Sequence, residues 1–177
     1  LKLLAARDSL SVQVHPDDRY AREREGQQGK TEVWYILDAQ PGAAIYYGFE
    51  RPVSRETFAR SIQLPEPEGG GEGGPEVVGL TRLLHRQPVR PGEVYLIPAG
   101  TVHAIGAGIL VAEIQQNSNV TYRIYDYGRL GADGKPRQLH IPQALDVTLR
   151  EPPKAQDFHG HLAQCDYFTV DAVEGDF

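Results

Sequence analysis

The sequence predicts an all-β fold with a few short helices, closed as a sandwich or barrel. Short runs rich in β-branched and aromatic residues recur along the chain, and turns containing Gly or Pro separate them. Strands at such close spacing are typical of β-sandwiches and β-barrels. The 177 residues are 40% hydrophobic, which is enough for the core of one domain, or of one domain and part of another.

The first informative strand is LSVQVH, at residues 10–15, whose two faces differ in character. Successive side chains of a strand point to opposite faces, so Leu10, Val12 and Val14 share one face. Gln13 and His15 lie on the other face. Such alternation is typical of a strand with one face in water, but a glutamine and a histidine also fit the wall of a polar pocket. This run alone leaves both interpretations open.

A charged helix, two strands and a second helix are expected next. Asp17 and Ser54 precede the two helical patterns and have side chains that cap helix N-termini. The expected elements are a helix at 16–25, strands at 30–39 and 43–50, and a helix at 54–64.

Residues 65–76, PEPEGGGEGGPE, are of low complexity and predict a flexible surface loop. The loop interrupts the domain and does not end it, because strand signals resume at once. The tail at 165–177 is again strand-like, and we expect it to begin a second β unit that the chain does not complete. Between loop and tail we expect strands at 77–89, 92–100, 102–116 and 119–128, and a helix at 141–149.

Composition excludes several classes of protein. A net charge of −6 argues against nucleic acid or an anionic membrane as the main partner, but not against a small anion in a locally basic pocket. Cys165 is the only cysteine, so no internal disulfide can form and a reducing compartment fits. No apolar run approaches the roughly 20 residues of a membrane helix, and the start lacks a signal-peptide pattern. These features favour a soluble cytoplasmic protein.

The chain starts at Leu1 and contains no methionine, whereas a natural reading frame normally begins with one. We therefore expect it to be an excised or incomplete stretch of a longer protein, without its N-terminal segment.

The most specific motif is PGEVYLIPAGTVHAI, at residues 91–105, which fits the pattern G-x5-P-x-G-x2-H. A turn at 91–92, a strand and a bend at 98–100 lead to His103, which starts the next strand. This pattern resembles the second conserved motif of the cupins, which are double-stranded β-helix barrels with a metal inside. The resemblance implies that His103 points into such a barrel.

Four blocks extend the resemblance from residue 1 to about residue 150. They are QVHPDD, GKTEVWYIL, PAGTVHAIG and IQQNSNVTYRIYDYGR. In this order they are similar to the type I phosphomannose isomerases, also called mannose-6-phosphate isomerases, in their short bacterial form. The resemblance implies an enzyme that interconverts mannose 6-phosphate and fructose 6-phosphate through a cis-enediol.

The same resemblance implies a zinc site with one ion per chain and with Gln13, His15, Glu32 and His103 as ligands. In most cupins an H-x-H pair stands where this chain has Gln13-Val14-His15. The residue types agree with a metal, because two imidazoles and one carboxylate suit zinc, although iron, manganese and nickel also accept such ligands. With a single carboxylate the site keeps a net positive charge, so the ion would remain a useful Lewis acid.

Two further residues are candidates for catalysis. Arg123 matches the family's active-site arginine, and we expect it to stabilise an oxyanion or hold a phosphate, because a guanidinium is a poor proton acceptor. Lys30 lies two residues before Glu32 and shares its strand face, so beside a metal it would take part in acid–base chemistry. The alternative for both is a side chain in solvent.

Close relatives carry an aspartate where this chain has Asn119, which cannot exchange a proton at neutral pH. Either the role of that carboxylate is dispensable, or Lys30, Glu113 or Asp126 takes it.

We therefore expect residues 1–150 to form a metal-binding cupin barrel, and 151–177 to form a linker and the start of a second β unit. The expected partner is a sugar phosphate, and the sequence does not predict the oligomeric state. Two other functions stay open at this point: a metal-dependent cupin of another class, such as an oxygenase or a different sugar isomerase, and a non-catalytic sugar-phosphate-binding cupin.

Overall fold

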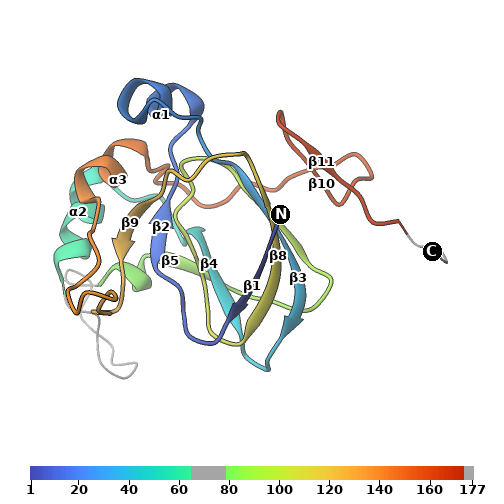
Figure 1. Cartoon of the computed structure of the whole chain (residues 1–177), viewed down its shortest axis with the longest axis horizontal. Coiled ribbons are helices and arrows are strands. Elements are labelled where there is room, and N and C mark those ends of the chain that lie inside the picture. Colours follow the sequence, from blue (N-terminus) through green and yellow to red (C-terminus); the bar gives the residue numbers. More distant parts are fainter. Residues whose placement is uncertain (65–78, 174–177) are drawn as a thin grey trace.

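The computed structural model describes residues 1–64 and 79–173, and in them the all-β prediction is confirmed. Two antiparallel sheets face each other as the walls of a barrel (Figure 1). The four-stranded sheet has the order β1 (Lys2–Ala6), β8 (Ile109–Gln115), β3 (Glu32–Ala39), β6 (Val94–Ile97). The five-stranded sheet has the order β5 (Leu84–Pro88), β4 (Ala44–Phe49), β7 (His103–Ile105), β2 (Val12–Val14), β9 (Tyr122–Tyr125).

Alternating side chains divide the apolar residues between the inside and the outside of the barrel. Trp34 and Ile36 of β3 meet Ile45 and Ile105 of the opposite sheet in a core between the two walls. β2 lies in one wall of this interior, and its polar face points into the interior. The aliphatic face of β2 packs outward.

Helices cover the outer face of the five-stranded sheet. Val12 and Val14 are fully buried there in one cluster with Phe58 of α2 (Arg55–Gln63) and Ala144 of α3 (Ile141–Val147). Both faces of β2 are therefore covered, so Gln13 and His15 do not point into bulk water.

The helices begin where the sequence predicts. The carboxylate of Asp17 accepts a hydrogen bond from the Tyr20 amide at the start of α1 (Asp18–Glu25), and the Ser54 hydroxyl accepts one from the Thr57 amide in α2. Gly26 ends α1 in the left-handed conformation.

The expected strand at 77–89 begins later than predicted. Residues 77 and 78 lie outside the described residues, as does the predicted loop at 65–76. Leu80–Arg82 form a turn of 3₁₀ helix, and strand pairing starts only at Leu84. The reason is the spacing of Leu80 and Leu83, which a 3₁₀ turn places on one side, toward the same core cluster.

The tail packs on the outside of the four-stranded sheet. Its strands β10 (Ala163–Gln164) and β11 (Thr169–Val170) pair with each other, and Ala163 is fully buried against Val33 and Leu96. The division into a barrel at 1–150 and a second unit at 151–177 stays a prediction. Within the described ranges, no helix has the length and apolar character needed to cross a membrane.

Candidate metal centre

A row of side chains crosses the inner face of the five-stranded sheet. The register pairs Tyr47 with His103, His103 with Gln13, and Gln13 with Arg123. Directly paired residues of antiparallel strands project from the same face, with Cβ atoms about 5 Å apart. Because Gln13 faces the barrel interior, His103 and Arg123 face it too.

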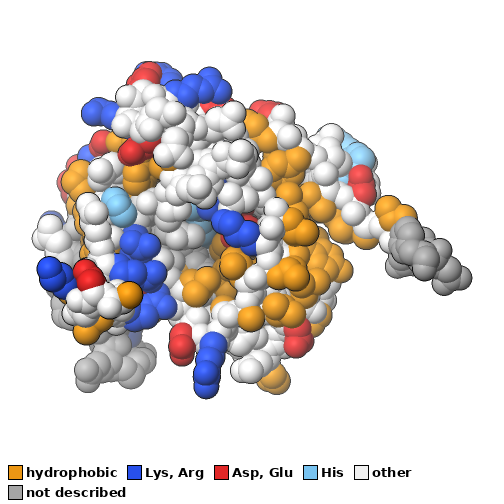
Figure 2. Space-filling view, viewed as in Figure 1, with side chains coloured by type: hydrophobic (Ala, Val, Ile, Leu, Met, Phe, Trp, Pro, Cys, Tyr) orange, Lys and Arg blue, Asp and Glu red, His pale blue; other side chains and the backbone are white. Residues whose placement is uncertain are grey.

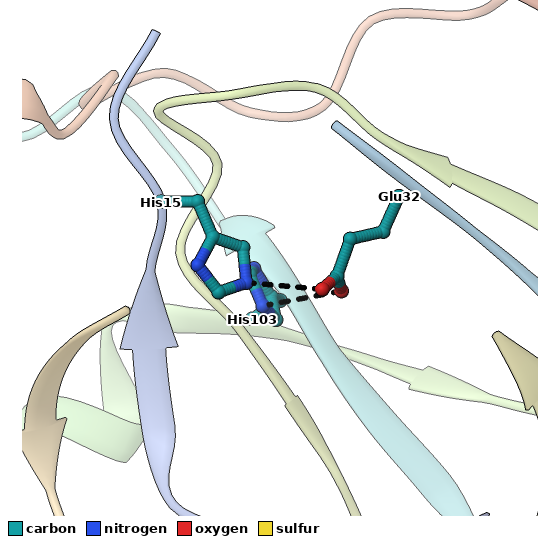
Figure 3. A group of neighbouring side chains, drawn as sticks. All are labelled: His15, Glu32 and His103. Atoms are coloured by element: carbon teal, nitrogen blue, oxygen red, sulfur yellow. Dashed lines mark ion pairs between the residues drawn. The ribbon is translucent and has the colours of Figure 1, made fainter. Parts of the chain in front are cut away.

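Three buried side chains converge from different elements. His15 follows β2, Glu32 begins β3 on the facing sheet, and His103 begins β7, and their candidate ligand atoms all lie within 4.8 Å of one another (Figure 3). The Nε2 atom of His15 lies 3.2 Å from Glu32 Oε1, and that of His103 lies 3.8 Å from Glu32 Oε2. Gln13 Nε2 lies 3.4 Å from His103 Nε2, so the predicted set comes together in one place.

Backbone carbonyls orient both imidazole rings. His15 Nδ1 lies 2.9 Å from the Val120 carbonyl oxygen, and His103 Nδ1 lies 2.8 Å from that of Thr101. A carbonyl accepts only, so each Nδ1 carries the proton and donates it. The Nε2 lone pairs of both rings then point at Glu32, which is the arrangement found around protein-bound metals.

The electrostatics keep the carboxylate charged and one imidazole neutral. Burial would raise the pKa of Glu32, but His15, His103 and Lys30 hold that pKa far below its ordinary value. Burial and the neighbouring His15 lower the pKa of His103 to about 3. Near pH 7 Glu32 is therefore ionised and His103 neutral, which are the protonation states that metal binding requires.

The donor set fits a divalent metal ion. Glu32 Oε1 is buried, and its neighbours among the described residues are the Lys30 ammonium group, in an ion pair, and His15 Nε2, which carries a lone pair and cannot donate to it. The atoms facing it are nitrogen and oxygen donors of the types that zinc binds. A cation between Glu32 and the two Nε2 atoms would be bound by lone pairs that otherwise face one another.

Lys30 lies at the edge of this cluster. Its side chain is buried, and its Nζ lies 2.5 Å from Glu32 Oε1 and 3.5 Å from His15 Nε2. The chain reaches this position because the amides of Gly29 and Lys30 bind Asp18 and Pro16, which brings the end of the α1 loop back beside His15.

Arg123 lies in the same row, but only some of its N–H groups have a hydrogen-bond acceptor. Its Nη1 donates to the Gln138 carbonyl oxygen at 3.0 Å, while its buried Nε has no hydrogen-bond acceptor among the described residues. Burial, then Arg137, lower its pKa from the ordinary value. The side chain is a cation with donors left over, beside the metal-ligand candidates.

The alternative acid–base residues have different surroundings. Glu113 is buried and pairs with Lys2 at 3.2 Å, on the strand beside Trp34. Asp126 is bound by Arg129 and Arg137 beyond the end of β9. Asn119 is exposed in the turn before β9.

The sequence interpretation missed the groups that position the ligands. Trp34 donates to Glu32 Oε2 at 3.2 Å and packs edge-on against His103, with ring centroids 5.3 Å apart. Its place two residues after Glu32, on the same strand face, was an available signal. The carbonyls of Thr101 and Val120 are backbone groups, so no residue type reveals them.

Comparisons with known proteins point to one family. No family model matches the chain. The mannose-6-phosphate isomerase of Streptococcus mutans is 44% identical over 87% of this chain and 45% of that protein. The crystal structure of the mannose 6-phosphate isomerase from Bacillus subtilis superimposes with a TM-score of 0.79 and 36% identity, over 94% of this chain and 52% of that one.

A mannose 6-phosphate isomerase structure bound with zinc and yttrium matches with a TM-score of 0.60 and 20% identity, over 85% of this chain and 54% of that one. This last likeness shows the fold alone. The chain spans about half the length of the curated relatives it matches.

Proposed function

The chain is a homologue of the mannose-6-phosphate isomerases over most of its length, and on this premise we propose that it carries the metal site of an isomerase that interconverts mannose 6-phosphate and fructose 6-phosphate. The observation that carries the proposal is the convergence of His15, Glu32 and His103 inside the barrel, with Arg123 in the adjacent position of the same row.

We assign the metal as one zinc ion per chain, held by Gln13, His15, Glu32 and His103. A half turn of the Gln13 amide presents its oxygen where its nitrogen now faces His103. Two neutral imidazoles, one amide and one carboxylate suit zinc and leave it a net positive charge. When bound, zinc supplies a Lewis acid that draws electron density from a sugar oxygen.

The isomerisation moves one proton between carbons and one between oxygens. In the direction from mannose 6-phosphate, the C2 proton leaves to a base and a proton returns to C1, while the O2 proton is lost and the aldehyde oxygen gains one. We assign the carbon-bound proton to Lys30 Nζ, which lies 2.5 Å from Glu32 Oε1 and 3.5 Å from His15 Nε2. It would accept this proton as the neutral amine, the form that a metal cation beside it favours.

Arg123 has the second role in this scheme. Negative charge develops on the sugar oxygens as C2 loses its proton, and a fixed cation with free N–H groups stabilises it. Because a guanidinium keeps its proton, Arg123 acts on charge and does not transfer the proton.

The test is an isomerase assay with mannose 6-phosphate before and after chelation, with zinc added back. We expect activity that chelation removes and zinc restores. Binding of the sugar phosphate without turnover would favour the non-catalytic alternative, and iron content with oxygen consumption would favour the oxygenase. Either result overturns the proposal.

Arg123 variants test the assigned role. Arg123→Ala should retain metal and fold while lowering kcat by about a hundredfold, the scale typical of losing one preorganised oxyanion donor. Arg123→Lys should recover only part of the lost kcat, because an ammonium group lacks the forked N–H donors of a guanidinium. An increase in KM alone would make Arg123 a ground-state clamp.

We also propose a cytoplasmic location. The single cysteine supports it, because a reducing compartment leaves a lone thiol unmodified.

A further inference from the structure

The connection from β8 to β9, residues 116–120, passes from one wall of the barrel to the other. β8 belongs to the four-stranded sheet and β9 to the five-stranded sheet. Glu32 begins β3 in the first sheet and His15 follows β2 in the second, and these two strands are not paired. The ladder of neither sheet therefore sets the distance between Glu32 and His15, so contacts outside the sheets must set it.

Gln116 holds Thr31, the residue between Lys30 and Glu32. The Gln116 amide donates to the Thr31 carbonyl at 3.0 Å, and the Gln116 side-chain Oε1 accepts from the Thr31 amide at 2.8 Å. In a regular antiparallel ladder the Gln116 carbonyl would accept this second bond, but here it accepts from the Gln115 side chain at 3.0 Å. The Gln116 side chain thus extends the pairing of β8 and β3 one residue beyond Glu32.

The other end of the same side chain reaches α1. Because its oxygen accepts from Thr31, the Gln116 Nε2 is left to donate, and it lies 3.2 Å from Asp18 Oδ1. That oxygen also accepts from the Gly29 amide at 2.9 Å. The backbone is therefore held on both sides of Lys30, at Gly29 by Asp18 and at Thr31 by Gln116. Gln116 and Thr31 are both buried, so these bonds are shielded from water.

Ser118 connects the same loop to His15. The Ser118 hydroxyl donates to the Gln28 carbonyl at 2.7 Å and lies 3.3 Å from the Val120 amide, which donates to it. The Val120 carbonyl accepts the Nδ1 proton of His15 at 2.9 Å. One buried hydroxyl therefore ties the loop that carries Lys30 to the residue that orients His15.

We propose that Gln116 and Ser118 are positioning residues, which set how Lys30 and Glu32 on one wall of the barrel lie relative to His15 on the other. This inference rests on the proposed function for the roles of Lys30 and Glu32. One backbone contact, from the Lys30 amide to the Pro16 carbonyl, acts in the same direction. The ties made by Gln116 and Ser118 run through side chains, so single substitutions can remove them.

The 116–120 segment is uncharged, which makes such substitutions informative. It reads Gln-Asn-Ser-Asn-Val, whereas Lys and Arg side chains gather on the surface over β9 and the loop that follows it (Figure 2). A neutral replacement in the segment leaves every charge near the metal centre in place. Its effect on metal binding or turnover then reports geometry and not a change in the electrostatic field.

Gln116→Met keeps the length of the side chain and removes both polar ends. The Thr31 amide is then buried without its acceptor, and Glu32 is free to shift. Zinc affinity, measured by competition with a chelator, should fall about tenfold, because losing a group that holds a metal ligand typically costs roughly 10- to 100-fold. The kcat for mannose 6-phosphate should fall about tenfold with a smaller change in KM, since a displaced Lys30 affects the proton transfer more than binding.

Ser118→Ala and Ser61→Ala form a matched pair. Both hydroxyls are buried and donate to a backbone carbonyl, that of Ser118 to Gln28 and that of Ser61 to Phe58 at 2.8 Å. Ser61 lies in α2, on the outer side of the five-stranded sheet. Both substitutions should lower the midpoint of urea unfolding. Only Ser118→Ala should also weaken zinc binding and lower kcat, each by about threefold or more.

The results separate this proposal from a purely structural role. Unchanged zinc affinity and kcat in folded Gln116→Met overturn it, and so do equal effects of Ser118→Ala and Ser61→Ala on these two quantities. Gln116 and Ser118 would then only stabilise the fold. If Gln116→Met does not fold, the serine pair still decides.

The same measurements separate the proposal from the proposed function. If the wild type binds zinc without turning over mannose 6-phosphate, and Gln116→Met weakens zinc binding, the positioning role stands and the isomerase function fails. If the wild type binds no zinc, amide hydrogen exchange of the metal-free protein decides. Faster exchange at residues 28–32 in Gln116→Met, with α2 unchanged, supports the positioning role, and unchanged exchange at 28–32 overturns it.

Discussion

At the scale of single residues, a backbone carbonyl sets the tautomer of each histidine of the candidate metal centre. The Thr101 carbonyl holds the proton of His103 on Nδ1, and the Val120 carbonyl does the same for His15. Neither imidazole can turn its Nε2 away without losing a buried hydrogen bond. The centre is therefore preorganised for a cation.

The first prediction concerns the metal content. His103→Ala should remove most of the bound metal from the protein, because no other described side chain stands ready to replace the lost Nε2. Elemental analysis of purified protein measures this directly, with about one divalent ion per wild-type chain as the reference. His85→Ala, a histidine that pairs with Glu50 outside the barrel interior, is the control and should retain its metal. Full retention in His103→Ala would refute the ligand assignment.

The second prediction concerns Asn119. Its side chain is exposed, while its neighbours fix the turn: Ser118 donates to the Gln28 carbonyl at 2.7 Å, and the Val120 carbonyl holds His15. A side chain that points to solvent is poorly placed for proton transfer at the metal. Asn119→Asp should therefore change the kcat for mannose 6-phosphate by no more than about twofold. A gain of a hundredfold or more would show that the carboxylate of relatives is catalytic.

At the scale of elements, a close backbone approach brings Lys30 to the metal centre. A Cβ on Gly29 would lie 2.4 Å from the carbonyl carbon of Asp17, so only glycine lets the end of the α1 loop pass this close. The Lys30 amide then reaches the Pro16 carbonyl at 3.1 Å. The glycine at position 29 therefore determines where Lys30 and Glu32 lie relative to His15.

The third prediction follows from this contact. Gly29→Ala should push the α1 loop away from Pro16, displace Lys30 from Glu32, and lower kcat by about tenfold or more, since small displacements at a catalytic site are costly. Gly26→Ala is the matched control in the same loop, because a Cβ there meets nothing within 4 Å and only the left-handed backbone is strained. It should reduce stability by about 1 to 2 kcal/mol, the cost of an L-residue in the left-handed conformation, and leave kcat unchanged. Equal kinetic effects of the two substitutions would contradict the role of Gly29.

The sequence predicted most strands and helix starts because periodicity and capping residues are local signals. Alternation placed Gln13 and His15 on one face, and Asp17 and Ser54 marked two helices. The pairing of Gln13 with His103 depends on a register between strands distant in sequence, which spacing does not reveal. The family resemblance implied beforehand that Gln13 and His103 lie close together, and their role as metal ligands stays a prediction.

The ion pairs of Asp126 with Arg129 and Arg137 could not be predicted in the same way. They depend on a bridge between Leu130 and Pro136, which is a tertiary feature without a periodic signal. Nor did propensity reveal that Leu80 and Leu83 would favour a 3₁₀ turn over an extended strand, because their shared burial decides it.

At the scale of the whole molecule, local and total charge have opposite signs. The chain carries a net charge of −6, yet Arg129 and Arg137 both bind the carboxylate of Asp126, three residues beyond Arg123. A negative surface disfavours nonspecific binding of polyanions, whereas a local positive cluster attracts a small anion over the short range that salt leaves unscreened. The charge distribution therefore favours a small anion over a nucleic acid.

The last prediction concerns global stability against pH. His140 Nδ1 accepts the Arg123 amide at 3.2 Å, and burial, then the charge of Arg123, lower the pKa of His140 below its ordinary value of 6.5. The unfolded chain thus takes up a proton at this histidine before the folded chain does. Its contribution to stability is fully present above about pH 6.5 and is lost as the pH falls toward the folded pKa.

His140→Asn keeps an acceptor but cannot titrate, so its free energy of unfolding should fall less than that of the wild type between pH 7.5 and 5. Urea unfolding of both metal-free proteins measures this difference. Solvent screening keeps the difference well under the limit of about 1.4 kcal/mol per pH unit for one proton. His103 is buried and has a pKa of about 3, so it too lowers the free energy of unfolding as the pH falls. Its effect is equal in the two proteins and cancels in the comparison. His159→Asn, at an exposed turn, is the control and should follow the wild type. Parallel curves for wild type and His140→Asn would mean that the folded protein does not lower the pKa of His140.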